Sequence, residues 1–241
     1  MSVQSGQLIA AARRLAARVD CLKFKPPVTH VYNPLDYARQ PYEAYARKFG
    51  NGKKRVIFLG MNPGPFGMAQ TGVPFGEVSA VRNWLGIEEP VQRPRREHPR
   101  RPVAGFACAR SEVSGRRLWR LFAERFGPAE NFFQEHFVAN YCPLVFCGRS
   151  GCNLTPEQLP KAECHRLFEA CDDHLRSVAE ALEPEWIVGI GLFAASRAKI
   201  AAEDGLFRTG GILHPSPANP SANRDWAGTV TRQLKALGVW K

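Results

Sequence analysis

Short apolar runs and segments with helical spacing alternate along most of the chain. The apolar runs have the length and composition of buried strands, and they lie at 56–59, 137–142, 185–191 and immediately before His214, ending with Ile212 and Leu213. Apolar residues recur on one helix face at 77–87, 118–126, 161–182 and 193–204. Strands that alternate with helices predict a parallel sheet with helices on both faces. We therefore expect an α/β fold, a three-layer α/β/α sandwich around a four-stranded parallel sheet.

The remaining segments are arranged around this sheet. Residues 1–22 form an amphipathic helix, which we expect to pack on the rest of the molecule. Residues 23–42 have the composition of an extended segment, and Ser111 or Ser114 is expected to cap the helix that follows. A chain of 241 residues is long enough for one sizeable core, so we expect a single domain over residues 1–241.

A stretch rich in glycine and proline, at 60–77, directly follows the first predicted strand. Its first eight residues hold three glycines, which permit close backbone approach, and two prolines, which fix the backbone on either side of Gly64. The stretch lacks the spacing of a phosphate-binding or dinucleotide-binding loop. Asn62 is therefore expected on a rigid ledge just beyond the carboxyl end of a buried strand, where open α/β sheets bind ligands.

Two further polar residues follow strands in the same manner. Asn140 lies at the end of the second predicted strand, close to Pro143, and His214 follows the fourth strand in the sequence H-P-S-P. Taken alone, such an asparagine commonly bonds the local backbone, and such a histidine is commonly a surface or core residue. Together with Asn62 they form a set without a strong nucleophile or paired carboxylates, which suits attack by water on a substrate with a good leaving group.

Charge and cysteine content narrow the class of partner. The chain has 33 Lys and Arg against 22 Asp and Glu, a net charge of +11, and the loop at 92–101 alone holds five arginines, so we expect a nucleic-acid partner. No lysine occurs between residues 55 and 160, which argues against Schiff-base chemistry. The seven cysteines contain no C-x-x-C pair, so we expect reduced thiols, with no metal and no cofactor. The longest apolar run, at 186–195, is too short for a membrane helix, so no membrane partner is expected.

At these same residues the chain resembles a known enzyme family. The sequences G-M-N-P-G-P-F-G-M-A-Q-T-G-V-P-F-G-E at 60–77 and H-P-S-P at 214–217 look like those of the single-strand-selective monofunctional uracil-DNA glycosylases of base excision repair. The likeness extends to S-E-V-S-G at 111–115, N-Y-C-P-L at 140–144 and N-L-T-P at 153–156. It implies a hydrolase that flips uracil out of DNA and cleaves its N-glycosidic bond, leaving an abasic site.

The resemblance implies a role for each site residue. Asn62 would orient the attacking water and His214 would donate to O2 of the leaving base, as the two catalytic residues. Phe75 would stack on the base, while the Asn140 amide would read its edge and distinguish uracil from cytosine. Backbone amides of Met61 and Phe75 would add donors. Gly64 would leave space beside C5, so 5-hydroxymethyluracil and other 5-substituted uracils are expected substrates.

The resemblance also implies contacts with single- and double-stranded DNA. These are expected from Ser111, Ser114, Ser216, Ala218, Asn219 and Arg224. In the family an arginine that enters the duplex as a plug follows H-P-S-P, but this chain has Ala218 there, and Arg224 is displaced in sequence. Plugging of the duplex is therefore in doubt.

Two readings from other classes stay open at this point. A catalytically silent nucleic-acid-binding module would use the same arginines and aromatic residues, and a zinc or iron–sulfur enzyme acting on nucleic acid would use the cysteines. On the main reading we expect a monomer, located in the cytoplasm with the nucleoid if the source is bacterial and in the nucleus if it is eukaryotic.

Overall fold

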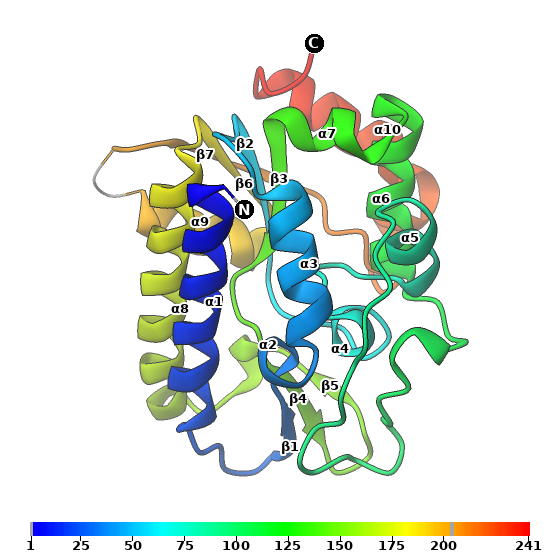
Figure 1. Cartoon of the computed structure of the whole chain (residues 1–241), viewed down its shortest axis with the longest axis vertical. Coiled ribbons are helices and arrows are strands. Elements are labelled where there is room, and N and C mark those ends of the chain that lie inside the picture. Colours follow the sequence, from blue (N-terminus) through cyan, green and yellow to red (C-terminus); the bar gives the residue numbers. More distant parts are fainter. Residues whose placement is uncertain (1, 203–204) are drawn as a thin grey trace.

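The main sheet has four parallel strands in the order β3-β2-β6-β7. The computed structural model describes residues 2–202 and 205–241, so the predicted helix ends at residues 1 and 203–204 lie outside the described part. The strands are β2 (Val56–Gly60), β3 (His136–Asn140), β6 (Trp186–Ile190) and β7 (Arg208–Ile212). Helices lie on both sides of this sheet (Figure 1). The predicted α/β fold with a four-stranded parallel sheet is confirmed.

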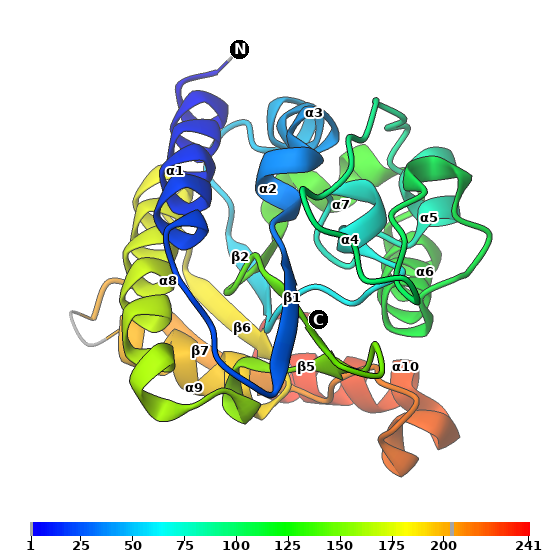
Figure 2. The ribbon, with the colours of Figure 1, turned by 90° about the horizontal axis from the view of Figure 1, so that it is seen from below.

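The strand order explains why both faces are covered. The chain passes from β2 outward to β3, then crosses back over β2 to β6 and continues to β7. Because parallel crossovers are right-handed, reversing the direction of winding moves the connecting helices to the opposite face. On one side lie α1 (Val3–Asp20), α8 (Lys161–Leu182) and α9 (Leu192–Ala201), and on the other lie α6 (Val113–Phe126), α7 (Ala129–Glu135) and α10 (Pro220–Ala236) (Figures 1 and 2).

Aromatic packing fills the layer between β2 and the helices α6 and α7. Phe58 of β2 is fully buried, with its ring centroid 5.0 Å from that of Phe122 and 6.1 Å from that of Phe132. On the opposite side, the buried face of α1 packs along α8. Among the described residues, no helix combines the length and the apolar character needed to cross a bilayer.

A second, smaller sheet was not predicted. It is antiparallel, in the order β1-β4-β5, and consists of β1 (Val28–Tyr32), β4 (Val145–Gly148) and β5 (Asn153–Leu154). The expectation of an extended segment over 23–42 is correct only for its first part, since β1 is followed by α2 (Pro34–Tyr37) and α3 (Arg39–Phe49). The pairing of β1 with β4 joins residues more than 110 positions apart, which local patterns do not reveal.

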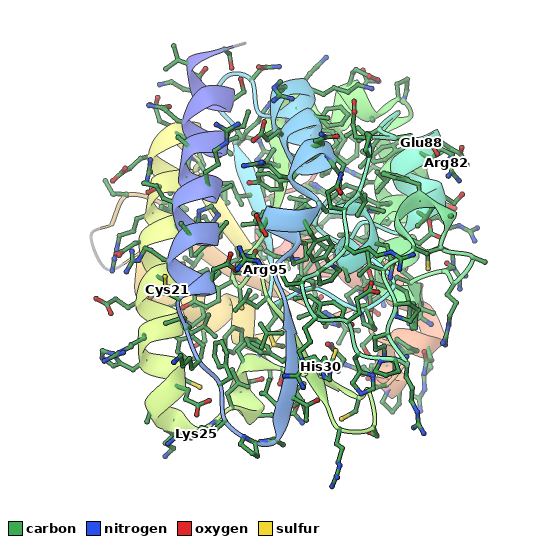
Figure 3. All side chains as sticks on the ribbon, turned by 60° about the horizontal axis from the view of Figure 1, so that its bottom comes forward. Cys21, Lys25, His30, Arg82, Glu88 and Arg95 are labelled. Atoms are coloured by element: carbon green, nitrogen blue, oxygen red, sulfur yellow. The ribbon has the colours of Figure 1, made fainter. Side chains whose placement is uncertain are left out.

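Two helix boundaries differ from the prediction. After the short α4 (Met68–Thr71), α5 (Val78–Asn83) ends earlier than the predicted 77–87. Arg82 instead closes the following turn through two hydrogen bonds of 2.8 Å to Glu88 (Figure 3). The predicted caps Ser111 and Ser114 are wrong, because Glu112 occupies the N-cap position of α6. Short 3-10 turns at Gly105–Ala107 and Pro156–Gln158 complete the described elements.

Candidate active site

The ledge begins where β2 ends, and it fixes the amide of Asn62. The Asn62 Nδ2 donates to the Leu144 carbonyl oxygen at 3.2 Å. Because a carbonyl only accepts, this contact identifies the nitrogen end of the amide. The Oδ1 atom is then turned away from Leu144, and Asn62 lines a cavity beside the ledge. The geometry leaves an oxygen acceptor available to a small molecule in that cavity.

Asn140 reaches the same cavity because its strand is paired with β2. Gly60 and Asn140 are partners in the parallel register, and the pairing continues through Tyr141 N–H to the Gly60 carbonyl and Cys142 N–H to the Met61 carbonyl, each at 2.9 Å. A Cβ on Gly60 would lie 2.3 Å from Asn140 Oδ1. The Asn140 amide therefore lies directly against the bare Cα of Gly60.

Phe75 lies against the same Cα and is held in an unusual backbone conformation. A Cβ on Gly60 would lie 2.5 Å from Phe75 Cε2, and Phe75 has a φ of 51°, in the left-handed region that non-glycine residues rarely adopt. Trp119 Nε1 donates to the Phe75 carbonyl at 2.9 Å, and the same carbonyl lies against Gly115, where a Cβ would approach to 2.1 Å. These contacts with α6 hold the ring in the cavity wall despite the backbone strain.

His214 follows β7 and is held as a neutral imidazole with a defined tautomer. The backbone N–H of Ser216 donates to Nδ1 at 3.1 Å, so Nδ1 has no proton and Nε2 carries it. Burial lowers the pKa of His214 to about 4, because the charged imidazolium loses hydration there. The ring centroid of His214 is 6.3 Å from that of Phe75. The site therefore presents an uncharged N–H donor next to the aromatic ring.

The segment that carries His214 is tied to the neighbouring helices. Trp226 Nε1 donates to the Leu213 carbonyl at 2.8 Å. From α6, Arg117 donates to the Pro215 carbonyl at 3.0 Å and to Asn223 Oδ1 at 2.9 Å. These hydrogen bonds fix the backbone on both sides of His214.

The predicted residues meet around one cavity of about 280 Å³. Those that line it are Met61, Asn62, Gly64, Phe75, Ser114, Asn140, His214 and Ser216. The three strand ends of β2, β3 and β7 thus deliver their polar side chains to one place. The assignment of chemical roles to these residues stays a prediction.

The other predicted residues lie outside the cavity lining. Ser111 is exposed and its Oγ accepts from Arg116, while Asn219 caps α10 by accepting from Ser221 N–H at 3.0 Å. Ala218 and Arg224 are exposed on the segment after His214, and in the described part of the chain the Arg224 side chain forms no hydrogen bond or ion pair. Their contacts with DNA stay predictions.

Four residues of the lining were not predicted, namely Pro65, Glu112, Asn153 and Thr155. Asn153 and Thr155 belong to the N-L-T-P sequence, which carried the family resemblance without a role attached to it. Glu112 belongs to the S-E-V-S-G sequence, which likewise carried the resemblance without a role for this residue, and an acidic residue at the start of a helix is common. Burial and, secondarily, the nearby Glu77 raise the pKa of Glu112 to about 7, against the opposing effect of the Gly115 amide.

The side chains around the cavity fit a flat, uncharged ring with polar edges. They offer an aromatic face for stacking, an amide that both donates and accepts, an amide oxygen that accepts, and an imidazole N–H that donates. Across residues 2–202 and 205–241, no three His, Cys, Asp or Glu side chains converge as they would around a metal ion. The arrangement suits binding of a heterocycle and orientation of a water molecule next to it.

The chain is similar to known uracil DNA glycosylases. A sequence model described as "Uracil DNA glycosylase superfamily" matches residues 47–235. The mouse protein "Single-strand selective monofunctional uracil DNA glycosylase" is 46% identical over 228 residues, which cover 94% of this chain and 82% of the mouse protein. The protein of the same name from cattle is also 46% identical, with 84% of its length covered.

A solved structure shows the same fold at much lower sequence identity. The crystal structure of SMUG2 from Pedobacter heparinus matches with a TM-score of 0.65 at 19% identity, covering 95% of this chain and 98% of the other. At that identity the match speaks for the fold alone.

We predict that His214 stays neutral, with its proton on Nε2, from pH 8 down to about pH 5. Burial lowers the pKa of His214 to about 4, and the Ser216 amide occupies Nδ1. Long-range ¹⁵N–¹H NMR spectra of the labelled imidazoles should show the Nε2–H tautomer across this range, with titration only near pH 4. Protonation of His214 already above pH 5 would contradict the prediction.

Proposed function

The chain belongs to the uracil DNA glycosylase superfamily, and on this premise we propose that it is a monofunctional glycosylase that removes uracil from DNA. Water hydrolyses the N-glycosidic bond, and the products are the free base and an abasic site. The observation that carries this proposal is the meeting of Asn62, Asn140, His214 and Phe75 around one cavity. The net charge of +11 supports a polyanionic substrate.

Base recognition rests on stacking and on one amide. A base stacked in a duplex cannot reach the cavity, so the nucleotide is flipped out, and its ring stacks on Phe75. The Asn140 amide accepts from N3–H and donates to O4. In the structure the Asn140 Nδ2 lies 3.3 Å from Met68 Sδ, which is a weak acceptor. The O4 atom of the base is a stronger acceptor and takes the place of this sulfur. Cytosine presents the opposite pattern and leaves both groups unpaired, at a cost of about 1–3 kcal/mol each.

Hydrolysis rests on Asn62 and His214. The Asn62 Oδ1 accepts a hydrogen bond from the attacking water and holds it below C1′, while the Nδ2 bond to Leu144 prevents rotation of the amide. His214 donates its Nε2–H to O2, where negative charge gathers as the base departs. Backbone amides of Met61 and Phe75 add donors. The base leaves as a stabilised anion, so the site needs neither a covalent nucleophile nor a carboxylate pair.

The same proposal covers uracils with a substituent at C5. No ledge side chain projects from Gly64 into the cavity, and the cavity of about 280 Å³ has room beside C5 for a small group or a water molecule. We therefore include 5-hydroxymethyluracil among the substrates.

The direct test uses a single-stranded oligonucleotide that contains one uracil, incubated with the protein in EDTA. We predict abasic sites without strand breaks, and breaks only after added alkali, because a monofunctional hydrolase forms no Schiff base. The described residues that line the cavity include no lysine. Borohydride trapping of a covalent protein–DNA adduct would contradict this, and an unchanged oligonucleotide would refute the proposed function itself.

We predict that Asn62→Ala and His214→Ala each slow single-turnover excision by about 10²–10³-fold, the usual cost of one oriented hydrogen-bonding group at a reacting centre. Asn62→Ala should keep most of its affinity for uracil-containing DNA, since it acts on the water and not on the base. Excision rates are measured by quenched flow and affinities by fluorescence anisotropy.

Exposed residues of the same types provide matched controls for this pair. Asn83→Ala on α5 and His165→Ala on α8 change the same side chains on the surface, and both should retain the wild-type rate. A rate within about threefold of wild type for Asn62→Ala or His214→Ala would remove that residue from the mechanism.

We predict that Ala218→Arg increases excision from duplex DNA more than excision from single strands. Ala218 is exposed on the segment after His214 and fills little of the gap that a flipped base leaves. Unstacking costs a few kcal/mol, part of which an inserted side chain offsets, so the duplex to single-strand rate ratio should rise by up to about tenfold. Single-turnover rates on both substrates give the ratio.

A control substitution distinguishes insertion of the side chain into the duplex from the effect of an added positive charge. Ser221→Arg adds the same charge at an exposed position on the first turn of α10 and should raise both rates equally. An equal rise on both substrates for Ala218→Arg would show that it only improves phosphate binding. No rise on either substrate would show that another residue, with Arg224 as the candidate, already occupies the gap.

A further inference from the structure

The carboxyl group of Glu112 lies in the cavity wall, directly on the backbone of the ledge. A Cβ on Gly64 would lie 1.8 Å from Glu112 Oε1, and a Cβ on Gly67 would lie 2.1 Å from Oε2. Both distances are far below any real contact, so the carboxyl group occupies this place only because both ledge residues are glycine. Glu112 and Gly64 line the cavity together.

Helix capping accounts for this position only in part, since the Gly115 amide in the first turn of α6 favours the charged carboxyl group. Glu112 occupies the N-cap position of α6, but its side chain makes no capping hydrogen bond. The chain offers a direct contrast, because Glu77 caps α5 by accepting from Ala80 N–H at 2.8 Å. Within the described residues, no side chain donates a hydrogen bond to Glu112 or forms an ion pair with it. The Glu112 carboxyl group is half-buried, and without a side-chain donor it keeps hydrogen-bonding capacity for a ligand or water in the cavity.

The order of atoms around the pyrimidine ring indicates which edge faces Glu112, on the premise of the proposed function. In the proposed complex, His214 donates to O2, Asn140 bonds N3–H and O4, and Asn62 lies below the N-glycosidic bond. The edge left over is C5–C6. Gly64 lies two residues beyond Asn62 in the ledge, and the wall beside it is the Glu112 carboxyl group.

We propose that Glu112 is a specificity-determining residue that reads the substituent at C5 of the flipped base through a direct hydrogen bond. The ligands of this subsite are uracils with a small polar group at C5. With unsubstituted uracil, a water molecule takes the place of the substituent.

The protonation state of Glu112 decides which substituents it accepts. A carboxylic acid donates and accepts, whereas a carboxylate only accepts. A 5-hydroxymethyl group donates and accepts, so it pairs with either form. A 5-formyl group only accepts, so it pairs with the acid and is repelled by the carboxylate.

Few charged groups face this carboxyl group. Burial raises the pKa of Glu112 to about 7, and the negative charge of Glu77, the residue that precedes α5, adds to this effect. His214 faces it across the cavity and is neutral above about pH 5, since burial lowers its pKa. The nearby arginines are engaged elsewhere, with Arg110 on the Phe66 ring, Arg116 on Ser111 and Arg117 on Pro215.

The test compares excision of 5-formyluracil with excision of uracil as the pH rises from 5.5 to 8. As Glu112 loses its proton near pH 7, the donor to the formyl oxygen is lost, so the formyl to uracil rate ratio should fall by about tenfold, the weight of one hydrogen bond to a charged or buried partner. Single-turnover rates on single-stranded oligonucleotides give the ratio for each protein separately.

The Glu112→Gln variant has an amide that donates at every pH, so its ratio should stay constant within about twofold. Titration of 5-formyluracil itself is common to both proteins and cancels in this comparison. Glu124→Gln, on the exposed surface of α6, is the matched control and should reproduce the wild-type curve.

A second variant keeps the test independent of the folding of Glu112→Gln. Glu77→Gln removes the neighbouring charge while its amide oxygen still accepts from Ala80, so the midpoint of the ratio should move to lower pH. A wild-type ratio that does not change with pH, or an identical pH dependence in Glu112→Gln, would overturn this inference while uracil excision stands. Absence of uracil excision at every pH would instead refute the proposed function.

Discussion

The missing side chain at Gly60 is the constraint on which the candidate site depends. Parallel pairing places Gly60 opposite Asn140, and the Asn140 amide and the Phe75 ring both occupy the space of the absent Cβ. An alanine there would push apart the Asn140 amide and the Phe75 ring, the two groups that we propose bind the base. The register of β2 and β3 therefore fixes how the Asn140 amide lies relative to the Phe75 ring, and the packing of the sandwich maintains that register.

Loss of hydration sets the charge state of the cavity. Burial lowers the pKa of His214 to about 4 and raises that of Glu112 to about 7, so both groups move toward their neutral forms. The excess of basic residues, 33 against 22 acidic ones, lies in the chain as a whole and suits the phosphate backbone. On the proposed function, a cavity whose ionisable groups are shifted toward their neutral forms would recognise a neutral base, while the basic residues elsewhere would attract the DNA backbone.

The sequence was informative wherever the signal was local. The apolar runs gave the parallel sheet, and the carboxyl ends of parallel strands share one edge, so the meeting of Asn62, Asn140 and His214 followed from their positions. Contacts between distant segments were missed. The β1–β4 pairing joins residues far apart in sequence, and Glu112 enters the cavity wall only because α6 starts beside two ledge glycines. The S-E-V-S-G sequence at 111–115 supported the family resemblance, but nothing in it shows that the Glu112 side chain reaches these glycines.

The positive φ of Phe75 sets stability against activity at one residue. The hydrogen bond from Trp119 and the close contact with Gly115 hold the φ angle of Phe75 at 51°. This strained conformation lowers the stability of the folded state. A glycine would adopt the same conformation without strain but would remove the stacking ring. Selection for heat resistance alone would therefore act against the aromatic residue, and its presence indicates that the fold tolerates local strain for the sake of a preformed binding surface.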